Sequence, residues 1–266
     1  MKRRHRILGA VMALGAATAL TLTACSSSDD SGSKPAASDA AATELLNKAA
    51  DATAALTGAH LTVNVDGPAF QSLNATAVEA DVNTKPNVSG KGTATLNMGN
   101  KTVKAPFVYL DESFYANIDD QGWINYGDGR SIYDVSQVLN PDKGVPHILR
   151  SITGAKIDGT EDVDGAKATK VTGTVAAKDV TALTGASGKN ATESTESMKT
   201  TVWITDQNQV AKVVVAPSDK VTLTVGISKW NSSVEVTKPD NVKTPSAKPT
   251  APPAGGGPTR GEKAAN

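Results

Sequence analysis

A single cysteine, Cys25, lies directly after an uncharged apolar run close to the N-terminus. No other cysteine occurs among the 266 residues, so no disulfide can link two parts of the folded chain. A domain without such cross-links must bury enough apolar surface to hold itself together. Amphipathic segments downstream of Cys25 must therefore supply a sizeable core.

The first 24 residues have the pattern of a bacterial export signal. Residues 1–6 carry four basic side chains and no acidic one, and residues 7–22 form an apolar run. This run is shorter than the roughly 20 residues of a membrane-spanning helix. It ends in the letters LTAC, an apolar residue and two small ones before Cys25, which is typical of a bacterial lipobox. The pattern predicts cleavage before Cys25 and acylation of its thiol, so that lipid chains such as palmitate anchor the protein on the outer face of the cytoplasmic membrane.

Cleavage also changes the charge of the chain. The precursor has 27 basic and 27 acidic side chains, and residues 1–24 hold four of the basic ones and none of the acidic ones. The mature chain therefore has 23 basic and 27 acidic side chains, a net charge of −4. We expect no nucleic-acid partner, because no basic field remains. Both the general secretory and the twin-arginine export routes stay open, since Arg3 and Arg4 are present without the rest of the twin-arginine motif.

Composition divides the mature chain into three parts. Residues 25–40 are rich in Ser, Asp and Gly and are expected to form a flexible tether. Residues 240–266 are rich in Pro and Gly and are expected to form a disordered tail. All ten aromatic residues lie between Phe70 and Trp230, which places one domain at residues 41–239.

Hydrophobic periodicity within this domain predicts one helix followed mainly by strands. Residues 41–57 have helical spacing, with Ser38 or Asp39 as the cap and Gly58 as the stop. Further helical segments are predicted at residues 131–152 and 179–183. The other segments alternate apolar and polar residues and are separated by short turns, which favours an antiparallel meander. The fold class predicted is α+β, with strands at residues 61–66, 93–98, 156–163, 167–175, 199–205, 210–215 and 221–228.

Residues that carry chemistry are sparse in this domain. After cleavage only His60 and His147 remain, and neither has a cysteine or carboxylate at metal-ligand spacing. We interpret both as surface or helix-end histidines. The sequence also lacks a Gly-x-Ser-x-Gly motif and a phosphate-binding glycine loop. The prediction is a protein that is not an enzyme and needs no metal or cofactor.

Four stretches resemble the LppX/LprAFG lipoproteins of actinobacteria. They are AHLTV at 59–63, IYDVSQVLNPDKG at 132–144, TVWI at 201–204 and SKWNSSVEV at 228–236. The resemblance covers roughly residues 42–239. Within the family, the chain resembles the LprG branch. The Pro- and Gly-rich segment from about Thr244 has no counterpart in that family.

This resemblance implies a curved antiparallel half-barrel with helices on its concave side, enclosing an apolar cavity. The cavity would hold the acyl chains of a membrane lipid or glycolipid that the protein carries within the cell envelope. A major-facilitator exporter is implied as a partner, and we expect a monomer. The inward-facing positions expected to line the cavity are Val78, Ala80, Val82, Ala94, Leu96, Met98, Phe107, Tyr109, Val202, Ile204, Val213 and Leu223.

The residues by themselves leave a second interpretation open. Inward positions filled by Ala and Val could leave a void under a curved sheet, but they could also close into a packed core of small side chains. A packed domain would suit a cell-surface interaction or regulatory module without a ligand cavity. The identity of the lipid, the direction of transfer, the partner protein and the role of the tail do not follow from the sequence.

Overall fold

A computed structural model of the chain describes residues 38–67, 75–98, 100–127, 135–180, 183, 196–218 and 221–243. The predicted signal peptide, Cys25 and the tail beyond residue 243 lie outside these residues. None of the described helices combines the length and the apolar character needed to cross a membrane.

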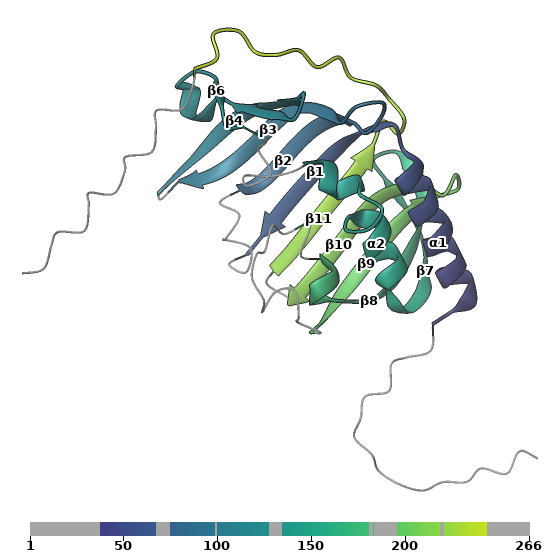
Figure 1. The fold of residues 1–266 in the computed structure, drawn as a ribbon. Coiled ribbons are helices and arrows are strands. Elements are labelled where there is room, and N and C mark those ends of the chain that lie inside the picture. Colours follow the sequence, from purple (N-terminus) through teal and green to yellow (C-terminus); the bar gives the residue numbers. More distant parts are fainter. Residues whose placement is uncertain are drawn as a thin grey trace, which may run out of the picture. The chain divides into compact units, whose positions relative to one another are not determined.

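Eleven strands in the described residues form one antiparallel sheet, which is curved and does not close (Figure 1). This confirms the predicted α+β fold. The first and last strands pair with each other in the middle of the sheet, so that an N-terminal half, β1–β6, adjoins a C-terminal half, β7–β11. The strands are β1 (Gly58–Asp66), β2 (Ala75–Asn83), β3 (Ser89–Met98), β4 (Lys101–Leu110), β5 (Ser113–Ala116), β6 (Ile124–Asn125), β7 (Thr153–Val163), β8 (Ala166–Ala176), β9 (Ser197–Thr205), β10 (Val210–Ser218) and β11 (Val221–Ser228).

One row of small and β-branched residues crosses both halves on the same face of the sheet, here called the inner face. Successive members of the row are direct cross-strand partners, and such residues suit a pleated surface that is buried on one side. Polar residues alternate with them along each strand and therefore lie on the opposite, outer face. From β4 to β8 the row is Ala105, Ala94, Val78, Val63, Val225, Val213, Val202 and Val171.

Helix α1 (Ala40–Ala55) begins as the sequence predicts, because the Asp39 carboxylate accepts a hydrogen bond of 2.9 Å from the backbone N–H of Ala41. It does not end at the predicted stop, Gly58. That glycine opens β1, where a Cβ atom would lie 2.2 Å from the backbone oxygen of Ser232. The glycine is needed for the close approach of two backbones, and this prediction of its role was wrong.

The other helical segments are short. The segment predicted at 131–152 contains the 3-10 turn η3 (Val135–Leu139) and helix α2 (Val145–Ser151), and a further turn, η4 (Ala177–Val180), lies close to the predicted short helix. Helix α2 packs on α1 and β8, and α1 packs on β7. Arg150 of α2 donates a hydrogen bond of 2.7 Å to Asp51 of α1. The two helices therefore cover the C-terminal half of the inner face (Figure 1).

Residues 231–243, here called the strap, run from the end of β11 to β6 (Figure 1). Near its start, Asn83 of β2 exchanges two hydrogen bonds with the backbone of Val234, at 2.8 and 3.0 Å. At its end, Lys243 forms a parallel bridge with Ile124 of β6. The structured part of the chain thus continues past residue 239, where we expected the domain to end.

Candidate functional site

The predicted cavity residues of the C-terminal half are sealed. Val202, Ile204, Val213 and Leu223 project to the inner face from β9, β10 and β11, and all four are 0 % exposed. They belong to one apolar cluster with buried side chains of α1 and α2. An enclosed space large enough for water would leave accessible surface on the residues that line it. Each of these four side chains is therefore in contact with protein on all sides.

The predicted residues of the N-terminal half are buried to different degrees. Val78, Ala80 and Val82 of β2 are nearly buried, as is Phe107 of β4. A second group on the same face is only half-buried or exposed. These residues, here called the apolar strip, are Ala94 and Leu96, which are half-buried, Met98, which is 53 % exposed, and the half-buried Tyr109.

Glycines shape the sheet beside this strip. Gly90 and Gly92 of β3 lie directly opposite Tyr109 and Phe107 of β4. A Cβ atom on Gly92 would lie 2.1 Å from the backbone oxygen of Glu79, so only glycine permits this approach of β3 to β2. Pairs of glycine and an aromatic residue are a known means of supporting a curved strand, because the ring covers the site that lacks a side chain. The curvature beneath the strip is thus built into β3 and β4.

The sequence prediction missed two residues of the inner face, one aromatic and one aliphatic. Phe114 of β5 stacks on Phe107, with ring centroids 5.6 Å apart, and Leu61 of β1 lies opposite Ala80. Both belong to the buried cluster of the inner face. Their alternation with polar neighbours in β1 and β5 was the available signal. What the sequence lacked was the register that places these strands beside β2 and β4.

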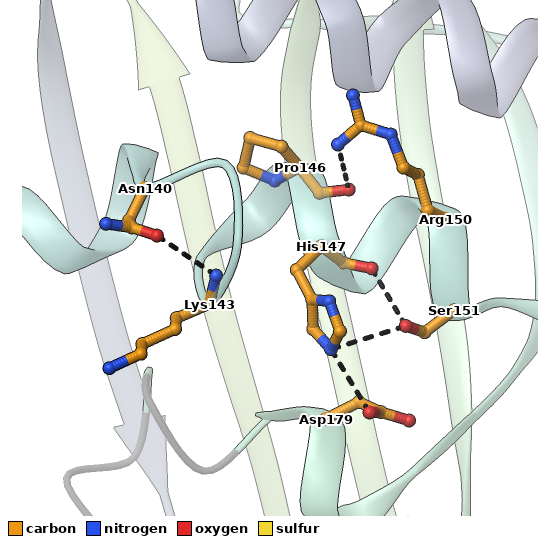
Figure 2. A network of polar contacts seen from close by, with 7 residues as sticks. All are labelled: Asn140, Lys143, Pro146, His147, Arg150, Ser151 and Asp179. Carbon is orange, nitrogen blue, oxygen red and sulfur yellow. Dashed lines mark hydrogen bonds and ion pairs between the residues drawn. The ribbon is translucent and has the colours of Figure 1, made fainter.

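A serine, a histidine and an aspartate meet at α2, but not in a catalytic arrangement (Figure 2). The Nε2 atom of His147 lies 3.1 Å from Asp179 and 3.5 Å from Ser151, and the Ser151 hydroxyl donates to the backbone oxygen of His147 at 2.9 Å. In a catalytic triad the carboxylate and the hydroxyl contact different ring nitrogens. This cluster ties α2 to η4. No group of three potential metal ligands gathers within the described residues either.

Several known proteins are similar to this chain in sequence. The LppX_LprAFG lipoprotein family model matches residues 41–236. The lipoprotein LprA of Mycobacterium tuberculosis is 34 % identical over 243 residues, which cover 88 % of this chain and 94 % of that protein. The lipoarabinomannan carrier protein LprG of Mycobacterium leprae is 35 % identical over 243 residues, with 89 % and 97 % covered.

Two crystal structures share the fold. LprF from Mycobacterium bovis superposes with a TM-score of 0.67 at 22 % identity, covering 76 % of this chain and 99 % of that one. LppX from Mycobacterium tuberculosis gives a TM-score of 0.57 at 28 % identity, covering 75 % and 100 %. The predicted resemblance is confirmed: this chain belongs to the LppX/LprAFG family of lipoproteins.

Proposed function

We propose that this protein is a non-enzymatic carrier that holds acyl chains of a lipid or glycolipid against the apolar strip and moves it within the cell envelope. The observation that carries the proposal is the incomplete burial of Ala94, Leu96 and Tyr109 on a face whose C-terminal half is sealed. Contiguous apolar surface left open on a folded domain is a feature of ligand-binding grooves and interaction sites.

The energy available at such a strip is large enough for the task. Each methylene moved from water to an apolar surface contributes about 0.8 kcal/mol. A dozen buried methylenes would therefore contribute about 10 kcal/mol before the cost of ordering the ligand. The name of the LprG relatives, lipoarabinomannan carriers, supports a glycolipid as the ligand class.

The tether defines where a carrier of this design can work. We propose that acylated Cys25 anchors the chain to the outer face of the cytoplasmic membrane, in keeping with the lipoprotein family. Thirteen peptide units separate Cys25 from Ser38, the first described residue, so the domain can move at most about 45 Å from its anchor. A monomer with this reach could pass its ligand to a membrane protein nearby, and a major-facilitator exporter is the partner that we propose to test.

Native mass spectrometry of the chain from Ser26 onward tests carriage. We expect co-purified lipid on the wild-type protein and a strong reduction on a variant that fills the strip, Ala94→Trp. Thr95→Trp, on the outer face of the same strand, is the matched control and should keep its lipid. A wild-type protein that carries no lipid when purified from its native envelope would contradict the proposal.

One observation favours a second function. The C-terminal half of the inner face is fully packed, as expected for an interaction module without a cavity. In that case native mass spectrometry would find no lipid on the wild-type protein. The protein would then be captured with a protein partner rather than with lipid.

The anchor has its own test. Cys25→Ser removes the thiol that accepts the lipid, so the variant should take up no labelled palmitate, whereas the wild type should be labelled. An unlabelled wild type would refute anchoring at this residue, whatever the ligand of the domain.

A further inference from the structure

A pocket of about 460 Å³ lies on the outer face of β1–β4, away from the apolar strip. This volume is within the usual range of ligand pockets, about 300–1,000 Å³. Pro106 and Val108 of β4 contribute apolar surface to the pocket, and Trp123, from the segment before β6, lies at its border. Val108 is buried although it points to the outer face. The pocket is thus a shallow depression that is open to solvent on the outer face of the sheet.

Polar side chains from three neighbouring strands converge in this pocket. His60 of β1 is the cross-strand partner of Asp81 of β2, and Asp81 is the partner of Lys91 of β3. The Nδ1 atom of His60 lies 2.8 Å from Asp81, and its Nε2 atom lies 3.6 Å from Glu79. The half-buried His60 therefore positions Asp81, whereas Glu79 lies close to the ring without a hydrogen bond.

Several polar atoms of the pocket have no partner among the described residues. They are the ammonium group of Lys91, the hydroxyl of Thr93 and the indole N–H of Trp123, together with one carboxylate oxygen of Asp81. The pocket thus offers hydrogen-bond donors and acceptors side by side. A ligand that both donates and accepts would satisfy them together.

The segment that carries Trp123 is held from both sides. The backbone N–H of Gly122 donates to the side chain of Asn117 at 2.8 Å, and the backbone oxygen of Trp123 accepts from Lys243 of the strap at 2.8 Å. The Lys243 ammonium also donates to the backbone oxygen of Gln121 at 3.2 Å. The backbone that carries the tryptophan is therefore held in place before any ligand binds, which lowers the cost of binding.

A second tryptophan on the outer face, Trp203, has its indole N–H and its ring engaged by other side chains of the chain. The indole N–H of Trp203 donates to Glu161 at 2.8 Å, and the ammonium of Lys212 lies 4.5 Å from the ring centre. Trp203 is only 8 % exposed. Its indole N–H and its ring are engaged within the chain, whereas Trp123 lines the pocket and its indole N–H has no partner among the described residues.

From this arrangement we infer that the outer-face pocket binds a neutral saccharide of one or two rings. Sugar hydroxyls donate and accept at once, and the apolar face of a sugar ring can lie on an indole. The pocket combines the ammonium of Lys91 with the carboxylates of Glu79 and Asp81, so its charges do not match an ion of a single sign throughout. The inference is independent of the lipid-carrier proposal, because this pocket and the apolar strip lie on opposite faces of the sheet.

Fluorine NMR of the chain from Ser26 onward, labelled with 5-fluorotryptophan, tests the inference. The chain has three tryptophans, so Trp203 and Trp230 serve as internal controls. We expect maltose, cellobiose or a mannose disaccharide, added to about 50 mM, to shift only the Trp123 signal in a saturable manner, with Kd in the millimolar range. Choline and glucuronate should leave it in place.

Variants assign the binding to the pocket. Trp123→Ala should weaken binding by roughly tenfold, measured by calorimetry or by a ligand-observed signal. Glu79→Gln, at a side chain that is 71 % exposed and thus dispensable for folding, should weaken it by roughly two- to tenfold. Glu161→Gln is the matched control, because this outer-face carboxylate already serves Trp203, and it should bind as the wild type does.

The same measurement separates two sources of the saccharide. Equal affinity for methyl glucoside and octyl glucoside would indicate a free or polymeric saccharide. Higher affinity for octyl glucoside than for methyl glucoside would indicate the headgroup of a glycolipid. A Trp123 signal that no neutral sugar shifts, or that choline shifts instead, would overturn the inference, as would unchanged binding in both Glu79→Gln and Trp123→Ala.

Discussion

The two halves of the inner face differ in burial although they share one row of residues. In the C-terminal half, Val202 and Val213 are 0 % exposed under α1 and α2. In the N-terminal half, Ala94 belongs to the same row but is half-buried. Strand alternation is alike on both sides of the β1–β11 pair. The difference teaches that strand alternation alone does not decide which inner positions are core, because the helices seal the C-terminal half whereas part of the N-terminal half stays accessible.

The largest change in the free energy of unfolding should come from truncating a fully buried side chain. Leu223→Ala removes a fully buried side chain beneath the helices and should lower the free energy of unfolding by about 2–5 kcal/mol. Leu96→Ala, the same change in the apolar strip, should cost clearly less because the side chain is only half-buried. Urea unfolding of both lipid-free variants measures the contrast. Equal losses would mean that the two halves are packed alike.

Enlarging an inner-face side chain should lower stability in the C-terminal half and lipid binding in the N-terminal half. Val213→Trp forces an indole into packed surroundings and should cost about 1–3 kcal/mol or more. Ala94→Trp has room to project and should unfold near the wild-type temperature, while its bound lipid is lost. Thermal unfolding and native mass spectrometry of the same samples provide both readouts. Severe destabilisation by Ala94→Trp in protein that never carried lipid would argue that the strip is core.

The strap should stabilise the N-terminal half, as α1 and α2 stabilise the C-terminal half. Removing residues 238–266 deletes the three hydrogen bonds of Lys243 and the contact of Lys238 with Tyr115, at 5.9 Å from the ring centre. At about 0.5–1.5 kcal/mol for each hydrogen bond, the loss should be about 1.5–4.5 kcal/mol. Removing only residues 244–266 is the control and should leave the melting temperature nearly unchanged. A loss of several degrees in the control would show that the tail itself docks.

The smallest effect should be a pH-dependent one in the C-terminal half. Hydrogen bonds from Trp203 and then Lys170 hold the pKa of Glu161 below its usual value of 4.5. A lowered pKa stabilises the folded state above pH 4.5, and this contribution is lost as the pH falls through the lowered value. Glu161→Gln should therefore be slightly less stable than wild type at pH 7, with the difference narrowing below pH 4.5. Melting curves at several pH values test this, and a difference that persists at low pH would contradict it.

Much of the local structure could be predicted because it depends on near neighbours. The Asp39 cap, the hairpin turn at Asp164 and Gly165, and the alternation of β7 and β8 all arise within a few residues of sequence. Gly58 was misjudged because its reason lies in Ser232, a residue far along the chain. The candidate site was predicted only as a set of inward positions. Which of them stay accessible depends on helices that the alternation of the strands does not locate.

The sequence by itself excluded an internal disulfide and determined the class of fold and the family, since these depend on composition, local periodicity and similarity; the export signal with its lipobox stays a prediction from the same sequence. Only the tertiary structure decided that β1 pairs with β11, that the helices seal one half of the inner face, and that the strap holds Trp123 beside His60, Asp81 and Lys91. The reason is physical: burial and pocket formation are properties of side chains brought together from distant segments, and strand register and helix docking bring them together.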